Sequence, residues 1–170
     1  MSNFNNDLAR GIYYENKAIN IMSKYGFSDL KRVDGYKIEY DITGLYLNKP
    51  VYIESKYNKY TSYTNKFFIE CFNTKYEPSG ITATESTYYI LFSYFDYWIL
   101  KTDKLKNALE EQLRILINRK DASYDDLINY VKENGIYTKN TVGVLIPIEI
   151  INKYTLYKGN HKKKLIKYNT

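Results

Sequence analysis

The sequence has one cysteine and one histidine among its 170 residues, and no apolar run approaches the length of a membrane span. Because Cys71 is the only cysteine, a disulfide framework and a cysteine-based zinc site are excluded. His161 lies near the carboxyl end, which argues against histidine-based triads and HExxH zinc chemistry. An enzyme built on this chain would therefore have to use carboxylates and lysines.

Targeting and nucleotide-binding patterns are also absent. The chain lacks a P-loop and the glycine pattern of dinucleotide-binding folds, so no nucleotide cofactor is expected. Its first residues lack the apolar core of a signal peptide, which together with the lone cysteine predicts a cytoplasmic protein without a membrane partner. The many Lys, Asn, Ile and Tyr residues suit an AT-rich phage, plasmid or low-GC bacterial gene. The 21 tyrosines therefore do not indicate base stacking by their number alone.

The positive charge is concentrated at the carboxyl end. The net charge is +6, and residues 151–170 hold six lysines and no acidic residue, so residues 1–150 are neutral as a whole. Such a segment either contacts a polyanion such as nucleic acid or only keeps the protein in solution. We expect one domain over 1–150 and a basic segment over 151–170. The candidate nucleic-acid-binding residues are Lys162, Lys163, Lys164 and Lys167.

The first expected element is a helix from about Asp7 to Tyr25, ended by Gly26. Apolar residues recur in it at three- and four-residue spacing, which is the period of one helix face. Glu15 falls within this apolar stripe. A carboxylate at a core-facing position destabilises the fold unless it is paired or bound to a metal.

Later segments alternate strand and helix signals. The expected strands cover residues 36–42, 51–57, 66–72, 88–94, 97–100 and 141–146, and the expected helices cover 81–86, 103–118, 123–134 and a short stretch after Pro147. The first two strands are expected to form a hairpin with a turn at 48–50. The sequence thus predicts an α/β or α+β domain, in which a mixed β-sheet is flanked by helices.

Three carboxylates and a lysine are expected to converge in this fold. Glu54 and Lys56 are two apart on a strand, so their side chains emerge on the same face. Asp41 lies on the polar face of the preceding strand, and Glu15 approaches from the helix. Hard oxygen ligands hold Mg²⁺, which lowers the pKa of a bound water and neutralises charge on a phosphate. Metal-dependent hydrolysis of a phosphodiester needs such a set of groups.

Asp41, followed thirteen residues later by Glu54-Ser55-Lys56, resembles the signature of the PD-(D/E)xK nuclease superfamily. Glu15 resembles the acidic residue that many members carry on the first helix. The expected order of elements over about residues 7–100 is similar to the family's restriction-endonuclease-like αβββαβ core. Tyr40 stands where the name-giving proline would be, a departure found in many members.

The resemblance implies a divalent-metal-dependent endodeoxyribonuclease. Asp41 and Glu54 would bind Mg²⁺ or Mn²⁺, together with the carbonyl of Ser55, and Lys56 would position the attacking water. Glu15 would bind the metal directly or through water. Members act in restriction, repair, recombination and phage DNA processing. Several small ones are dimers that cut branched DNA, as Holliday-junction resolvases do, so a homodimer acting on DNA is expected.

Each of these residues also has an ordinary structural interpretation. Glu54 and Lys56 could form a solvated pair on a half-exposed sheet, and Asp41 could be a surface residue at a strand end. A buried lysine or tyrosine could satisfy Glu15. Glu70, in the strand over 66–72, is a weaker candidate, for which a structural place or a supporting place beside the metal ligands is favoured over direct metal binding.

Two other functions stay open on the same fold. One is a non-catalytic module that binds nucleic acid or another protein, with the basic segment as its source of affinity. The other is an RNA nuclease, for which the sequence offers no recognition signature. Against the non-catalytic module stands the complete acidic set, because a pure binding scaffold has little use for a carboxylate in an apolar stripe.

Overall fold

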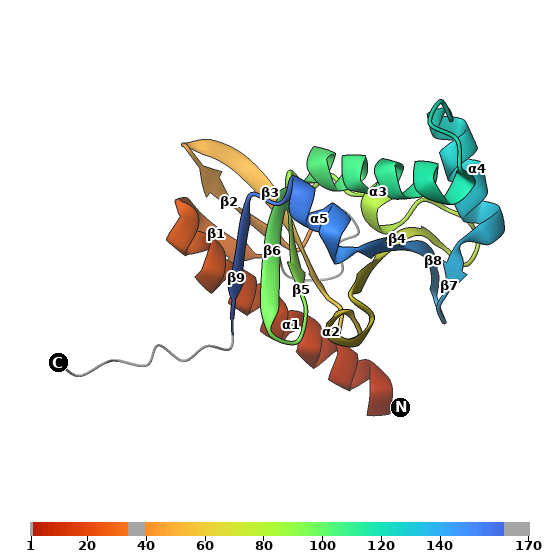
Figure 1. The fold of residues 1–170 in the computed structure, drawn as a ribbon. Coiled ribbons are helices and arrows are strands. Elements are labelled where there is room, and N and C mark those ends of the chain that lie inside the picture. The colour runs from red at the N-terminus through yellow and green to blue at the C-terminus, as the bar shows by residue number, and fades with distance from the viewer. Residues whose placement is uncertain (1, 34–39, 162–170) are drawn as a thin grey trace.

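The computed structural model describes residues 2–33 and 40–161, which form two β-sheets with helices packed against them (Figure 1). In this part of the chain, the larger sheet has six strands in the spatial order β1 (Phe27–Arg32), β2 (Ile42–Tyr46), β3 (Lys49–Tyr57), β5 (Tyr88–Phe92), β6 (Asp96–Lys101) and β9 (Tyr157–Asn160). The smaller sheet has the order β4 (Lys66–Asn73), β8 (Thr141–Pro147) and β7 (Ile136–Tyr137). The helical elements are α1 (Ser2–Met22), η1 (Ser23–Tyr25), α2 (Thr61–Thr64), η2 (Gly80–Thr82), α3 (Thr102–Ile117), α4 (Tyr124–Asn134) and α5 (Ile148–Tyr154). The expected fold class, a mixed sheet flanked by helices, is confirmed.

Helix α1 packs against β1 and β3 on one face of the larger sheet (Figure 1). It begins earlier than expected and continues through η1 to Gly26, whose φ of 83° is a left-handed conformation that glycine adopts without strain. Its buried side chains are Tyr14, Ala18, Ile21 and Met22. The buried stripe is therefore rotated from the predicted one, because Leu8 is 54% exposed and Glu15 lies at the margin.

Strands β2 and β3 form the expected hairpin, but its turn falls at Leu47 and Asn48 instead of 48–50. Both turn residues have positive φ, 52° and 60°, as two-residue hairpin turns require. Pro50 lies within β3. The expected strand over 36–42 lies mostly outside the described residues, and β2 begins at its last residue.

The sequence predicts residues 66–72 as the third antiparallel strand, and this prediction is wrong. Strands β1, β2 and β3 form the antiparallel series, and β5 then pairs with β3 in parallel. The segment predicted as third, residues 66–72, does form a strand, β4, but it pairs with β8 in the smaller sheet. The connection from β3 to β5 holds α2, β4 and η2, and the helix expected over 81–86 is reduced to the single turn η2.

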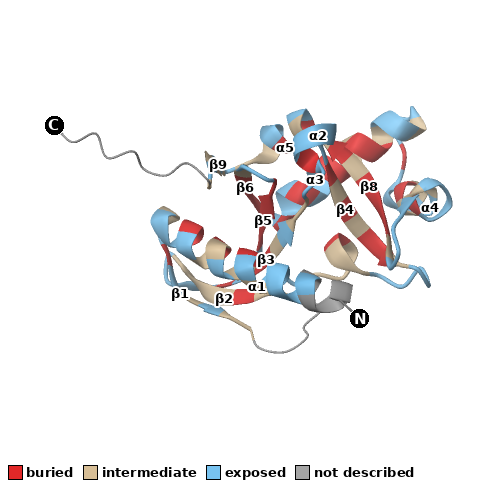
Figure 2. Ribbon diagram, turned by 90° about the horizontal axis from the view of Figure 1, so that it is seen from below, coloured by how far each residue is buried: buried red, intermediate tan, exposed pale blue. Residues whose placement is uncertain are grey.

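The apolar core has two parts, on opposite faces of the larger sheet. One part lies between this sheet and α1, and the other lies between this sheet, the smaller sheet and helices α3, α4 and α5. Strand β5 is buried along its whole length, as expected for a central strand covered on both faces (Figure 2). No helix in the described part of the chain is long and apolar enough to cross a membrane.

Residues 151–161 of the expected basic segment belong to the folded part of the chain that the structure describes. Lys153 lies in α5 and its ammonium contacts Glu111 of α3, while β9 pairs with β6 and completes the larger sheet. The ammonium of Lys158 lies 5.0 Å from the centre of the Trp98 ring. The boundary expected at residue 150 therefore falls inside α5. The four candidate DNA-contacting lysines lie outside the described residues: Lys162, Lys163, Lys164 and Lys167.

Candidate active site

The β2–β3 hairpin brings Asp41 opposite Glu54. Ile42 pairs with Ile53, and the backbone N–H of Asp41 donates to the Ile53 carbonyl at 3.0 Å. The Asp41 carboxylate is held as well, because its Oδ2 accepts the backbone N–H of Ser55 at 2.8 Å. Asp41 is thus fixed to β3 by its backbone and by its side chain, one residue before β2 begins.

Glu54 and Lys56 project from the same face of β3, as their spacing predicts. The Glu54 carboxylate is buried, at 5% exposure, and the Lys56 ammonium lies 2.7 Å from its Oε1. The Lys56 side chain itself is half exposed. The pair is therefore not the solvated surface pair of the ordinary interpretation, because its acidic member is inside the protein.

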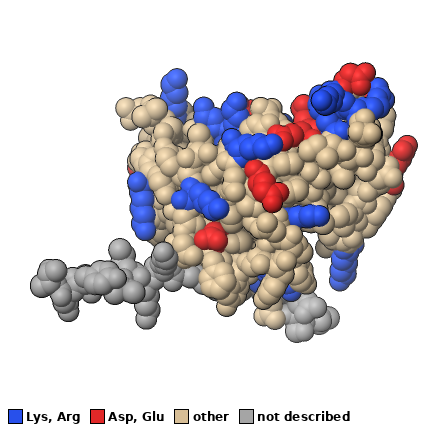
Figure 3. Space-filling model, viewed as in Figure 1, with Lys and Arg blue, Asp and Glu red and all other residues tan. Residues whose placement is uncertain are grey.

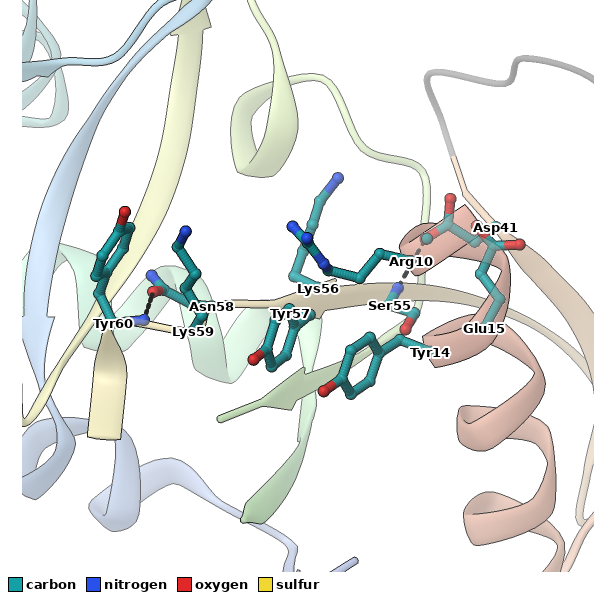
Figure 4. A pocket seen from close by; sticks show the side chains of 11 residues that line it. Arg10, Tyr14, Glu15, Asp41, Ser55, Lys56, Tyr57, Asn58, Lys59 and Tyr60 are labelled. Atoms are coloured by element: carbon teal, nitrogen blue, oxygen red, sulfur yellow. Dashed lines mark hydrogen bonds between the residues drawn. The ribbon is translucent and has the colours of Figure 1, made fainter. Parts of the chain in front are cut away.

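Glu15 reaches the same region from α1. Its side chain is 19% exposed and lies 3.7 Å from the guanidinium of Arg32, at the end of β1. Figure 4 shows the carboxylates of Glu15 and Asp41 next to each other at one end of a cleft. The structure thus brings Asp41 close to Glu54 and Lys56 and also to Glu15, while Glu54 does not line the cleft with the other three.

All three carboxylates of this cluster have raised pKa values, with burial as the largest cause. Burial, together with repulsion from Asp41 and Glu70, raises the pKa of Glu54 to about 7, although Lys56 opposes the shift. Burial also raises the pKa of Asp41, against the effect of Lys56 and the Ser55 N–H. The pKa of Glu15 is raised by burial and by Asp41. A further cation would stabilise all three groups in their charged forms.

Lys56 is held in its protonated form. Desolvation acts to lower its pKa, but the carboxylates of Glu54 and Asp41 outweigh that effect and raise the pKa above its ordinary value. The ammonium is therefore a hydrogen-bond donor and a positive charge at neutral pH, and it cannot serve as a general base.

A cleft of about 430 Å³ opens beside these groups, between α1 and the end of β3 (Figure 4). Its lining includes the cations of Arg10, Lys56 and Lys59. On its wall the rings of Tyr14 and Tyr57 stack with their centroids 4.1 Å apart. Sequence reasoning missed Arg10, Asn58, Lys59 and Tyr60 as lining residues, because polar side chains on a helix surface and in a loop carry no periodic signal.

Glu70 lies on the other side of Lys56, in a smaller cavity of about 130 Å³ between the two sheets. It accepts a hydrogen bond from the hydroxyl of Ser79, and it is close enough to Glu54 to raise that residue's pKa. The structure therefore places the weaker candidate next to the cluster. Its hydrogen bond to Ser79 gives it a structural role at that position.

The donor set fits a hard divalent cation, since carboxylate oxygens are the ligands that Mg²⁺ and Mn²⁺ prefer. In the described residues, however, no three acidic, histidine or cysteine side chains are arranged so that they could hold a metal ion as they stand. Lys56 occupies one Glu54 oxygen and the Ser55 N–H occupies one Asp41 oxygen. The chemistry of the site fits such an ion, and the observed side-chain positions are those of a charge-paired state.

Comparisons with protein-family models, with curated proteins and with solved structures find no match for this chain. The resemblance to the PD-(D/E)xK nucleases therefore stays a prediction from the motif and from the order of elements.

Proposed function

We propose that the protein is a divalent-metal-dependent endodeoxyribonuclease, which hydrolyses phosphodiester bonds in DNA. The observation that supports this most directly is the buried carboxylate of Glu54, which pairs with Lys56 and has its pKa raised in part by Asp41, two residues that line an open cleft. A fold has little structural reason to gather carboxylates with raised pKa values, one of them buried, around one lysine. Such groups are characteristic of a site that binds a cation and a phosphate.

Each residue of the cluster has a chemical part in this proposal. Asp41 and Glu54 would hold Mg²⁺ or Mn²⁺, with Glu15 and the carbonyl of Ser55 as further oxygen ligands. The bound cation would lower the pKa of a water molecule and neutralise charge on the phosphate. Lys56, always protonated here, would donate hydrogen bonds to that water or to a phosphate oxygen and so orient them for reaction.

The cleft supplies groups that suit a polyanion. Arg10 and Lys59 lie along its lining and would contact phosphates next to the one cleaved. Figure 3 shows Lys and Arg side chains spread among acidic ones on the face it displays, without one large basic patch. The positive charge that guides DNA would then come from the cleft and from the lysines after His161.

Isosteric variants test the catalytic residues. Plasmid, linear duplex and four-way junction DNA would be incubated with Mg²⁺, Mn²⁺ or EDTA, using the native chain and the variants Asp41→Asn and Glu54→Gln. Glu110→Gln is the matched control, since Glu110 pairs with Arg114 on the surface of α3. We expect metal-dependent products that both site variants abolish and the control retains. Undiminished cleavage by both site variants, in protein shown to be folded, would contradict the assignment.

The preferred substrate would define the subclass. Cleavage of the four-way junction alone indicates a branched-DNA nuclease, and cleavage of linear duplex indicates a restriction or phage-defence enzyme. An RNA substrate of the same sequence separates a ribonuclease from both. A homodimer is proposed because cutting both strands needs two active sites, and an intracellular location suits a protein whose single cysteine is unpaired.

One observation favours a non-catalytic binding module as a second candidate. Lys56 already neutralises Glu54, and no set of ligands in the described residues is ready for a metal. A binding module would retain DNA without any divalent ion, would lose it steeply as salt rises, and would form no products. Those three results together would favour it over the nuclease.

A further inference from the structure

Four large aromatic side chains are exposed next to the cleft, on two loops that lie side by side. Tyr60 and Tyr63 lie in the connection that contains the short helix α2, here called the α2 loop, and are 61% and 87% exposed. Tyr94 and Phe95 form the tip of the β5–β6 hairpin and are 46% and 49% exposed. We call these four residues the aromatic shelf. Tyr60 also lines the cleft (Figure 4), so the shelf adjoins it.

The two loops are fixed to each other by hydrogen bonds. The backbone N–H of Tyr94 donates to the hydroxyl of Ser62 at 3.2 Å, and that of Asn58 donates to the carbonyl of Phe92 at 2.8 Å. The hairpin tip is itself closed, because the N–H of Ser93 donates to the Asp96 carbonyl at 2.9 Å. The shelf is therefore a preorganised surface, which lowers the entropy lost when a ligand binds to it.

Tyr60 and Tyr63 are the two most exposed rings of the shelf. Hairpin tips favour small or polar residues that adopt turn conformations, and exposed aromatic rings there add nothing to the core. A cluster of exposed aromatic side chains on a small protein usually marks a binding surface. Composition explains why the chain has many tyrosines, but it does not explain why four exposed aromatic residues lie on two adjoining loops, one of which lines the cleft.

We propose that the aromatic shelf binds unpaired bases of single-stranded DNA and leads that strand into the cleft. Bases have an accessible face for an aromatic ring only where they are unpaired, since duplex bases already stack on each other. Charge complementarity supports this ligand: the ammonium of Lys59 lies 4.7 Å from the centre of the Tyr60 ring, and Arg10 lines the adjoining cleft. Aromatic rings beside cations are the usual composition of single-strand binding grooves.

This proposal rests on the proposed function only in the claim that the bound strand leads into the cleft. Binding is therefore measured under conditions that prevent catalysis. Fluorescence anisotropy of a labelled oligothymidylate and of a matched duplex would be recorded in EDTA. Tyr63→Ala should weaken binding of the oligothymidylate about tenfold and leave the duplex unchanged, since base stacking is worth about 1–3 kcal/mol per base. Tyr63→Phe keeps the ring and should bind like the native chain. Tyr124→Ala, which removes a 57% exposed ring from α4, is the control.

The proposal is overturned if the native chain does not bind the oligothymidylate, or if Tyr63→Ala binds it normally. It is also overturned if Tyr63→Ala loses both ligands equally. Analytical sedimentation of the same variants tests whether the shelf is instead a protein interface. A dimer that is lost with Tyr63→Ala, while DNA binding is retained, would assign the shelf to a second copy of this chain. Failure of the nuclease assignment gives a different result, namely unchanged cleavage by Glu54→Gln together with intact binding at the shelf.

Discussion

Replacing Glu54 with glutamine should stabilise the cation-free protein at alkaline pH while it abolishes cleavage. The Glu54 carboxylate is 5% exposed, and its pKa is raised from an ordinary value of 4.5 to about 7 by burial and by neighbouring carboxylates. That pKa already includes the attraction of Lys56. The charged form is therefore destabilising in the native state even with its partner in place.

The size of the effect follows from the pKa difference. A tenfold change in proton affinity is about 1.4 kcal/mol, so a rise from 4.5 to about 7 corresponds to about 3 kcal/mol in the free energy of unfolding. Glu54 binds its proton more tightly in the native state than in the unfolded state. Stability is therefore lost as pH rises from about 4.5 to 7, and the whole penalty is present above 7. Glu54→Gln removes it, which corresponds to a rise in Tm on the order of 10 °C at pH 8.

Thermal and urea unfolding in EDTA, at pH 5 and at pH 8, would measure this difference. We expect little change at pH 5, where native Glu54 is largely protonated, and a clear gain at pH 8. If the ion pair of Glu54 and Lys56 were stabilising, the change in stability would have the opposite sign, because the variant would leave Lys56 without its partner. A variant that is less stable than the native chain at pH 8 would refute the reasoning.

Three further outcomes follow from the same structure. Mg²⁺ should raise the Tm more at pH 8 than at pH 6, because the ion competes with a proton on Glu54. EDTA should reverse the rise in Tm, and an equal rise at both pH values would contradict the prediction. Cys71 is fully buried, with a pKa raised to about 12 by burial, so its thiol should react with a chromogenic disulfide reagent only after unfolding. Ser123→Ala removes a hydroxyl that accepts the backbone N–H of Asp126 and should cost about 1 kcal/mol in urea unfolding, whereas an unchanged midpoint would show that the cap contributes nothing.

The elements that the sequence predicted best are those whose cause is local. The capping box of Ser123 and Asp126 and the stop at Gly135 depend on neighbouring residues, and α4 has the expected bounds within a residue. Strand β5 was recognised from its continuous apolar run, and the helix after Pro147 from the fixed φ of proline. These signals act within one turn or one strand.

Features that depend on distant partners were predicted poorly. Nothing within residues 66–72 specifies whether their strand pairs with β3 or with β8, so β4 was placed in the wrong sheet. Strand β1 is an edge strand with a polar sequence and most of its side chains at least partly exposed, and it lacks the apolar alternation by which strands are recognised. Strand β9 was hidden in the same way, because its lysine and glycine were attributed to a basic terminus.

The candidate site was predictable although these pairings were not, because its geometry needs only one hairpin. A two-residue turn at Leu47 and Asn48 fixes the register that puts Asp41 opposite Glu54, and strand alternation then puts Lys56 beside Glu54. Asp41, Glu54 and Lys56 are therefore gathered by residues close in sequence, and Glu15 is added by the distant helix α1. The cleft lining and the aromatic shelf are gathered by α1, the α2 loop and the β5–β6 tip, which only the tertiary fold brings together. In the proposed function, the catalytic groups would thus be set mainly by local structure, and the surfaces that would select the substrate by the packing of distant segments.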